Sequence, residues 1–262
     1  MDVTERRKFI VEQVALHGEV EFSALAEVCA MSEMTIRRDI DVLQAEGLVR
    51  RVVGGAIAAR GTAQEPPFQS RASDAAQEKE HIATAVVDLL SPGETVLLDS
   101  GSTVLSVARE IRQRDMALTV VTPSVLVALE LSDAPHISVY LAGGLLRPGE
   151  LSLIGSDTVE YLGRFNCDTA VLGVAGIDDV GGISDYHHDE AYVKKAAMAI
   201  SKRTIVAADR TKLGRGALVK IADLHSIYAL VTDADRRNQT VKAAESLGVS
   251  VITVKPRETV SP

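Results

Sequence analysis

The sequence predicts an α/β protein in which an N-terminal winged helix-turn-helix domain precedes a larger domain with a mostly parallel sheet. Three observations support this prediction. Residues 1–57 show three short helical patterns followed by a β-like run. Residues 58–73 lose periodicity around Pro66 and Pro67, which indicates a linker. Residues 74–262 alternate short apolar strands with amphipathic helices, the pattern of a parallel sheet covered on both faces.

Composition and charge restrict the class of protein. The chain has 262 residues, of which 46% are hydrophobic but only 3% aromatic, so the core must be built from aliphatic side chains. A net charge of −8 argues against broad coating by nucleic acid, so any such binding must be local. No apolar run approaches the roughly 20 residues that span a bilayer, the N-terminus lacks a signal-peptide pattern, and the two cysteines form no CxxC motif. We therefore expect a cytoplasmic protein without a membrane partner.

The first helices are recognised by their caps. Thr4 is a candidate N-cap for the first helix, which Gly18 ends. Ser23 can cap a second helix over "ALAEVCA", and Ser32 can cap a third that ends before Gly47. The run "LVRRVVGGA" then indicates a short pair of strands closed by two glycines. This order of elements is the plan of a winged helix-turn-helix.

The third predicted helix carries two adjacent arginines. The buried face of its helical wheel holds Ile36, Ile40 and Leu43. Arg37 and Arg38 therefore point away from the core, near the end of the helix that enters the major groove in a helix-turn-helix. There, arginine binds guanine or phosphate. A solvated face with an ion pair such as Arg37 with Asp41 is the plainer alternative.

A second pair of arginines, Arg50 and Arg51, lies on the predicted wing. Because a turn precedes the first pair and the wing supplies another, DNA binding is favoured over a solvated helix face. One recognition helix per chain offers little contact area. We therefore expect a homo-oligomer, a dimer or a tetramer, on repeated half-sites of double-stranded operator DNA.

The stretch "LLDSGST" ends a predicted strand and opens a helix in the second domain. Ligands of open parallel sheets sit at the carboxyl ends of the strands. Gly101 permits close approach to the backbone, and Ser102 and Thr103 offer hydroxyl and N–H groups at a helix N-terminus, as a phosphate site requires. An ordinary capped turn between strand and helix explains this stretch equally well.

Longer motifs carry a resemblance to a known family. Residues 25–56, "LAEVCAMSEMTIRRDIDVLQAEGLVRRVVGGA", resemble the helix-turn-helix signature of the DeoR family of bacterial transcriptional regulators. Val53 stands where the family usually has His, and Ile40 where Leu is commoner. The motifs "LDSGST", "LAGG", "SLIGSDT", "GGIS", "EAYVKK" and "DRTKLG" follow in the order of the DeoR sensor domain. The resemblance covers roughly residues 3 to 255.

The resemblance implies a repressor of sugar metabolism genes that responds to a phosphorylated sugar or related metabolite. Its sensor domain is similar to the ribose-5-phosphate isomerase-like fold. The implied DNA contacts are Ser32, Thr35, Arg37, Arg38, Arg50 and Arg51. The implied effector site contains Asp99, Gly101, Ser102, Thr103, Thr122, Gly143, Gly144, Asp168, Glu190, Lys194, Asp209 and Lys212. Among these, Lys212 can supply positive charge for a phosphate.

Enzymatic, metal and cofactor functions are not expected. Isomerases of this fold carry a "GADE"-like acidic motif, whereas the corresponding stretch here reads "GVAGIDD". A sugar-phosphate isomerase-like enzyme with an accessory DNA-binding module is nevertheless the alternative hypothesis. The consecutive residues of "YHHDE", 186–190, cannot all face one metal ion from a regular element, so a loop is expected there. The spacing of "GVAGIDDVGG" does not fit a dinucleotide fingerprint.

Overall fold

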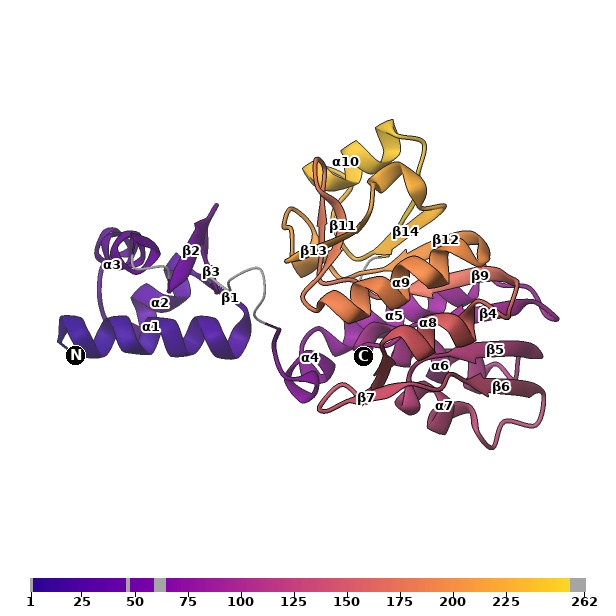
Figure 1. The fold of residues 1–262 in the computed structure, drawn as a ribbon. Coiled ribbons are helices and arrows are strands. Elements are labelled where there is room, and N and C mark those ends of the chain that lie inside the picture. The colour runs from indigo at the N-terminus through magenta and orange to yellow at the C-terminus, as the bar shows by residue number, and fades with distance from the viewer. Residues whose placement is uncertain (1, 46–47, 59–64, 255–262) are drawn as a thin grey trace, which may run out of the picture. The chain divides into compact units, whose positions relative to one another are not determined.

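The computed structural model describes residues 2–45, 48–58 and 65–254, and the chain forms two compact units (Figure 1). The first unit is Met1–Gln64 and the second is Glu65–Pro262. Within the described residues, no helix combines the length and the apolar character that crossing a bilayer demands.

The N-terminal unit is a winged helix-turn-helix, as predicted. Its elements are α1 Val3–His17, β1 Glu19–Glu21, α2 Phe22–Cys29, α3 Glu33–Ala45, β2 Val49–Val52 and β3 Gly55–Ala58. The three strands form an antiparallel sheet in the order β1-β3-β2. Ile36, Ile40 and Leu43 are buried, which confirms the helical wheel of α3. They pack with Ile10 of α1 and Leu25 of α2 in one apolar cluster.

Two of the three expected caps are wrong. The first helix begins at Val3, because the Asp2 carboxylate accepts from the Glu5 amide in a capping box, so Thr4 lies inside the helix. The second helix begins at Phe22 without a side-chain cap, so Ser23 also lies inside. At α3, by contrast, Ser32 Oγ accepts from the Thr35 amide at 3.2 Å, as predicted. Gly47, the expected end of this helix, falls outside the described residues.

The segment expected as a linker, residues 58–73, contains a short helix. Residues 59–64 lie outside the described part of the chain, but α4 spans Phe68–Ser73 and belongs to the second unit. Pro67 is its N-cap, and Phe68 packs on the main apolar cluster of that unit. The proline pair therefore starts a helix, which the loss of periodicity did not reveal.

The second unit is built on a seven-stranded parallel sheet in the order β15-β14-β12-β9-β4-β5-β6. These strands are β4 Thr95–Leu98, β5 Leu118–Thr122, β6 Ile137–Leu141, β9 Cys167–Leu172, β12 Ser201–Ala207, β14 Ala229–Thr232 and β15 Ser250–Thr253. A small antiparallel sheet contains β10 Gly176–Asp178, β11 Gly182–Asp185 and β13 Val219–Ala222, and a hairpin contains β7 Leu145–Arg147 and β8 Ser152–Ile154. The predicted α/β architecture with a mostly parallel sheet is confirmed.

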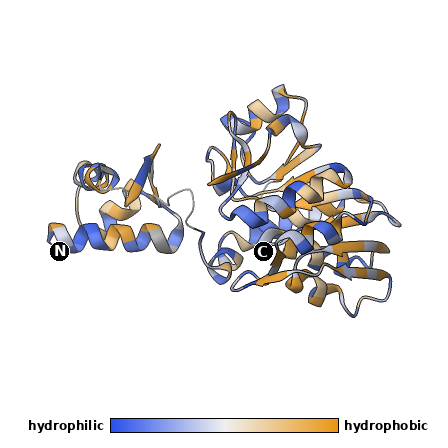
Figure 2. Ribbon diagram, viewed as in Figure 1, coloured by the Kyte–Doolittle hydropathy of each residue, from blue (hydrophilic) through white to orange (hydrophobic). Residues whose placement is uncertain are grey.

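Helices cover both faces of the large sheet (Figure 1). One face packs against α5 Ala76–Val87, α6 Ser102–Gln113 and α7 Val125–Leu131. The other packs against α8 Ser156–Leu162, α9 His188–Ala199 and α10 Gln239–Ser246. Figure 2 shows the hydrophobic colouring along the central strands that this arrangement buries. As in other doubly covered sheets, the space for a ligand remains at the strand ends.

Candidate DNA-binding surface and effector pocket

The N-terminal end of α3 presents a polar surface. Ser32 Oγ lies 3.0 Å from Thr35 Oγ1 in addition to capping the helix. Ser32 is exposed and Thr35 half-buried, so both hydroxyls lie where backbone N–H groups of the first turn are also accessible. Such a helix start attracts phosphate through its N–H groups and partial positive charge.

The two arginines of α3 differ in their contacts. Arg37 Nη2 donates to Glu33 Oε2 at 3.1 Å, and the guanidinium lies over the Phe22 ring, 4.8 Å from its centroid. Arg38 is exposed and has no hydrogen bond or ion pair with any part of the chain that the structure describes. The plainer sequence hypothesis paired Arg37 with Asp41, but its partner is Glu33, one turn earlier in the helix.

The two arginines of the wing also differ in their contacts: one is paired within the chain and the other is not paired within the described residues. Arg51 pairs with Asp41 of α3 at 2.6 Å, and its amide donates to Gln44 Oε1, so it fastens the wing to the helix. Arg50, on the neighbouring position of β2, is exposed and makes no ion pair within the described residues. Arg38 and Arg50 are thus exposed cations of α3 and β2 that no carboxylate of the described residues neutralises.

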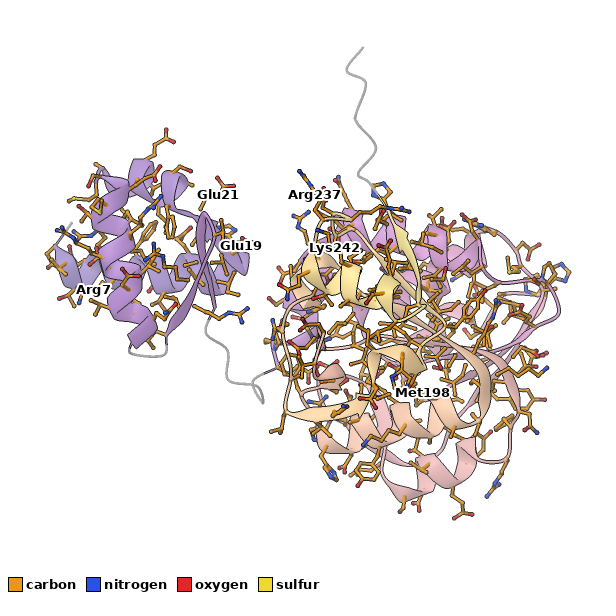
Figure 3. The ribbon with its side chains drawn as sticks, turned by 90° about the horizontal axis from the view of Figure 1, so that it is seen from above. Arg7, Glu19, Glu21, Met198, Arg237 and Lys242 are labelled. Atoms are coloured by element: carbon orange, nitrogen blue, oxygen red, sulfur yellow. The ribbon has the colours of Figure 1, made fainter. Side chains whose placement is uncertain are left out.

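A buried ion pair lies directly behind this surface. Asp39 is almost fully buried and accepts from Arg6 Nε at 2.7 Å and Arg7 Nε at 2.9 Å. Figure 3 labels Arg7 on α1. Arg6 and Arg7 of α1 therefore hold α3 in place through Asp39, the residue next to the exposed Arg38.

The second unit has a pocket at the carboxyl ends of β4 and β9. Its wall consists of Glu65, Arg71, Ser100, Gly101, Ser102, Thr103, Glu150, Gly173, Val174, Ala175, Asp185, Tyr186, Glu190, Lys194 and Lys212. Four of these side chains are acidic and three are basic. The pocket is therefore strongly polar, but its positive charge is already opposed by carboxylates.

The loop between β4 and α6 forms one wall of this pocket. Gly101 has φ of 108°, a conformation that side-chain-bearing residues rarely adopt, and it caps α6 without a side-chain bond. Ser102 and Thr103 follow in the first turn of α6. Ser102 Oγ donates to the carbonyl oxygen of Arg71 at 3.3 Å. The start of this helix therefore lines the pocket, and N–H groups of a helix start favour an anion.

A buried lysine with two carboxylates lies at the base of the pocket. Lys194 Nζ donates to Asp99 Oδ2 and lies 3.4 Å from Asp185 Oδ2. Burial raises the pKa of Asp99 to about 6, although Lys194 opposes the shift. Burial likewise raises the pKa of Asp185. Burial alone would lower the pKa of Lys194, but the charges of Asp99 and Asp185 outweigh it and hold this pKa above its ordinary value.

A second ion-pair cluster joins the start of the unit to the pocket. Arg71 pairs with Glu65 at 3.1 Å and with Glu150, while Arg147 pairs with Glu65 at 2.6 Å and with Glu190 at 2.9 Å. Ser152 also donates to Glu190. Burial would raise the pKa of Glu190, but Lys194, Ser152 and Arg147 lower it below its usual range.

The structure brings some of the residues expected at the effector site to the pocket wall. These are Gly101, Ser102, Thr103, Glu190, Lys194 and Lys212. Asp99 is not part of the pocket wall but forms an ion pair with Lys194, which is. Asp209 caps the short 3-10 helix Arg210–Lys212. Burial would raise the pKa of Asp209, but the charge of Lys212 and the bonds from Thr211 lower it, so Asp209 supports Lys212.

Other expected residues lie elsewhere. Asp168 is at the amino end of β9, where it accepts from the Thr95 amide and from Lys202, so placing it at the pocket was wrong. Thr122 ends β5, is fully buried and bonds to the Ser124 amide. The carbonyl oxygen of Gly143 accepts from Thr158, and Gly144 is packed against Thr158 with φ of 139°. These last three belong to the carboxyl edge of the sheet but not to the pocket wall.

Four charged residues of the pocket were not predicted. Glu65, Arg71, Glu150 and Asp185 line it, and three of them reach it from loops or from the short helix α4. Arg71 ends the stretch "PFQSR", residues 67–71. In the stretch "YHHDE", His187 is the N-cap of α9 and His188 stacks near Tyr192. Among the described residues, no three His, Cys, Asp or Glu side chains gather to hold a metal ion.

Two family models match the chain in the order of its two units. Residues 6–62 match the DeoR-like helix-turn-helix domain, and residues 74–234 match the DeoR C terminal sensor domain. A ribose 5-phosphate isomerase from Methanocaldococcus jannaschii is similar in structure over 53% of this chain and 55% of its own, with a TM-score of 0.41 and 16% sequence identity.

Curated relatives match over most of their length. The glycerol-3-phosphate regulon repressor of Escherichia coli (strain K12) is 32% identical over 234 residues, which are 89% of this chain and 92% of the relative. The HTH-type transcriptional repressor GlcR of Bacillus subtilis (strain 168) is 31% identical over 229 residues, 87% of this chain and 88% of the relative. With both domains matched in order and relatives of this similarity, the chain belongs to the DeoR family of transcriptional regulators.

Proposed function

We propose that this protein is a transcriptional repressor whose binding to operator DNA is modulated by a phosphorylated sugar or a related metabolite. The observation that carries the DNA-binding part is the exposed surface of α3 and β2, where Arg38 and Arg50 are not neutralised by acidic side chains. Two relatives are named as repressors, which supports the same function. A homo-oligomer on repeated half-sites supplies the contact area that one helix lacks.

The pocket supports the effector part of the proposal. The first turn of α6 offers N–H groups, Ser102 and Thr103 offer hydroxyls, and Lys212 offers a charge, as a phosphate requires. The carboxylates that also line the pocket suit the hydroxyl groups of a polyol. One relative is named for glycerol 3-phosphate, which makes this compound the first to test.

Replacement of Arg38 tests the DNA-binding surface. Arg38→Ala should weaken operator binding by roughly 10- to 100-fold, because a lost arginine–base contact costs about 1–3 kcal/mol. The fold should be kept, since Arg38 is exposed and forms no ion pair within the described residues. Binding is measured by fluorescence anisotropy at fixed salt on a duplex that the wild-type protein selects from a random library. Arg236→Ala, at an exposed arginine of the second unit, is the control. Equal affinity of Arg38→Ala and wild type would contradict the proposal.

Replacement of Lys212 tests the effector pocket. Thermal denaturation in the presence of phosphorylated sugars, beginning with glycerol 3-phosphate, should identify a stabilising compound. Lys212→Met should bind that compound about tenfold more weakly, since one charge-assisted bond to phosphate is lost. Lys242→Met, on the exposed face of α10, should bind as the wild type does. Turnover of pentose phosphates in the same samples would instead favour the isomerase alternative.

A further inference from the structure

The carboxylate of Glu65 is held between two arginines at the pocket wall. Its Oε1 lies 3.1 Å from Arg71 Nη2, and its Oε2 accepts from Arg147 Nη2 at 2.6 Å. The three side chains are only 12%, 14% and 18% exposed, respectively. Two guanidinium groups directed at one oxyanion are the usual way in which proteins bind a phosphate or a carboxylate of a ligand. Here the carboxylate of Glu65 lies between the two guanidinium groups, where a ligand anion would otherwise bind.

This cluster contains more negative than positive charge. Arg71 also pairs with Glu150, and Arg147 also pairs with Glu190, so two guanidinium groups face three carboxylates. Glu190 has further partners in Ser152 and Lys194. Glu65 has none beyond the two arginines among the described residues. Glu150 has only Arg71 as a partner among the described residues. Because an excess buried charge is costly, Glu65 and Glu150 are the members of the cluster that another anion can replace.

Glu65 lies where the two units of the chain meet in the sequence, so its contact with the two arginines also fixes this junction. The N-terminal unit ends at Gln64, and Glu65 is the first residue of the second unit. Residues 65–67 precede α4 and form no regular element. Arg71 Nε bonds to the Pro66 carbonyl oxygen at 3.1 Å, and Ser102 Oγ and Lys79 Nζ both donate to the Arg71 carbonyl oxygen. The same pocket wall therefore holds the point at which the chain leaves the second unit.

We propose that Glu65 is a built-in competitor of the effector: it occupies Arg71 in the free protein, and the anionic group of the effector displaces it. The inference rests on the proposed function, because the anion is taken to bind in the same pocket. Arg71 lines the wall together with Ser102 and Lys212, so a phosphate there draws Arg71 away from Glu65. Glu65 and Glu150 both pair with the same nitrogen of Arg71, Nη2, so a phosphate that binds this nitrogen competes with the Glu65 contact. Release of Glu65 then frees residues 65–67, and operator affinity changes by linkage.

Glu65→Gln in the full-length protein tests the inference, because it removes the charge but keeps the size of the side chain. With inorganic phosphate as the probe and thermal denaturation as the readout, the variant should bind phosphate at least about tenfold more tightly than the wild type. Glu150→Gln should also bind phosphate more tightly, because it removes another competitor for Arg71. Glu245→Gln, at an exposed position of α10, should match the wild type.

Two further measurements separate displacement from a general loosening of the protein. Hydrogen exchange at residues 65–73 should rise in the wild type when phosphate is added, and should already be high in Glu65→Gln without it. Operator affinity is measured at constant ionic strength. Adding phosphate should change the operator affinity of the wild type, and Glu65→Gln without phosphate should differ from the phosphate-free wild type in the same direction. Glu150→Gln should show a smaller change in operator affinity, since residue 150 does not border the junction.

The outcomes distinguish this inference from the proposed function. If phosphate stabilises wild type and Glu65→Gln equally, and exchange at residues 65–73 is the same in both, Glu65 is not a competitor and the inference is overturned while the pocket stands. If phosphate stabilises neither protein, the effector pocket itself is overturned, and the inference with it.

Discussion

Lys194→Met is expected to lower the free energy of unfolding of the second unit by about 3–5 kcal/mol, the usual cost of leaving buried charges unpaired. Lys194 is 3% exposed and forms ion pairs with Asp99 and Asp185, which are buried as well. Methionine fills a similar volume but supplies no charge and no donor. Two carboxyl groups at the base of the pocket then have to be buried without their shared cation, or to take up protons.

The loss of stability in Lys194→Met should increase with pH. Burial already raises the pKa of Asp99 to about 6 and raises that of Asp185. Without Lys194 both pKa values should rise further, because its charge is what opposes the effect of burial. A carboxyl group whose folded pKa is raised contributes stability below its unfolded pKa, and this contribution is lost as pH rises through the folded pKa. The difference in Tm between wild type and variant should therefore be larger at about pH 8 than at about pH 5.

The adjacent lysine is a matched control. Lys195 is exposed and lies over the Tyr192 ring, 5.4 Å from its centroid. Lys195→Met should change Tm little at either pH, since exposed charges contribute little to stability. Thermal denaturation followed by circular dichroism measures all three proteins. A Tm for Lys194→Met that equals the wild-type value at the higher pH would show that the lysine is not needed to neutralise the buried carboxylates.

The features that the sequence predicts best are those with a local signal. The burial of Ile36, Ile40 and Leu43 follows from spacing within one helix, and the cap at Ser32 follows from residues three apart. The strands of the parallel sheet are short apolar runs that read as strands without any knowledge of their neighbours. The turn at Gly101 between β4 and α6 could be predicted for the same reason, since strand, glycine and helix start are contiguous.

The ion pairs of the site have no such signal. Asp39 and Arg6 are separated by 33 positions, and Glu65 and Arg147 by 82, so their pairing depends on the tertiary fold. Asp168 was misplaced because motif order does not say at which end of a parallel strand a residue lies. The net charge of −8 likewise does not reveal that Arg6 and Arg7 pair with Asp39 inside the N-terminal unit.

Asp39→Ala is expected to destabilise the N-terminal unit by about 3–5 kcal/mol, because it leaves the buried guanidinium of Arg6 without its partner. Arg6 is only 5% exposed, and Arg7 loses the same carboxylate. Hydrogen exchange of α1 and α3 in the full-length protein should rise strongly, while exchange of the large sheet in the second unit should not change. Asp41→Ala, which removes an exposed ion pair on the same helix, should cost less than about 1 kcal/mol.

Operator binding should then fail in Asp39→Ala and in Arg38→Ala for different reasons. In Arg38→Ala the fold is intact and the contact to DNA is missing, so lower salt restores part of the affinity through the remaining cations. In Asp39→Ala the recognition helix is no longer held against α1, so low temperature or a stabilising osmolyte should restore binding and low salt alone should not. If Asp39→Ala kept wild-type exchange in α1 and α3 yet lost operator binding, Asp39 would act at the DNA surface rather than beneath it. We therefore expect adjacent residues of one helix to meet two separable requirements: Arg38 supplies a cation for DNA, and Asp39 supplies the anion that holds the helix in place.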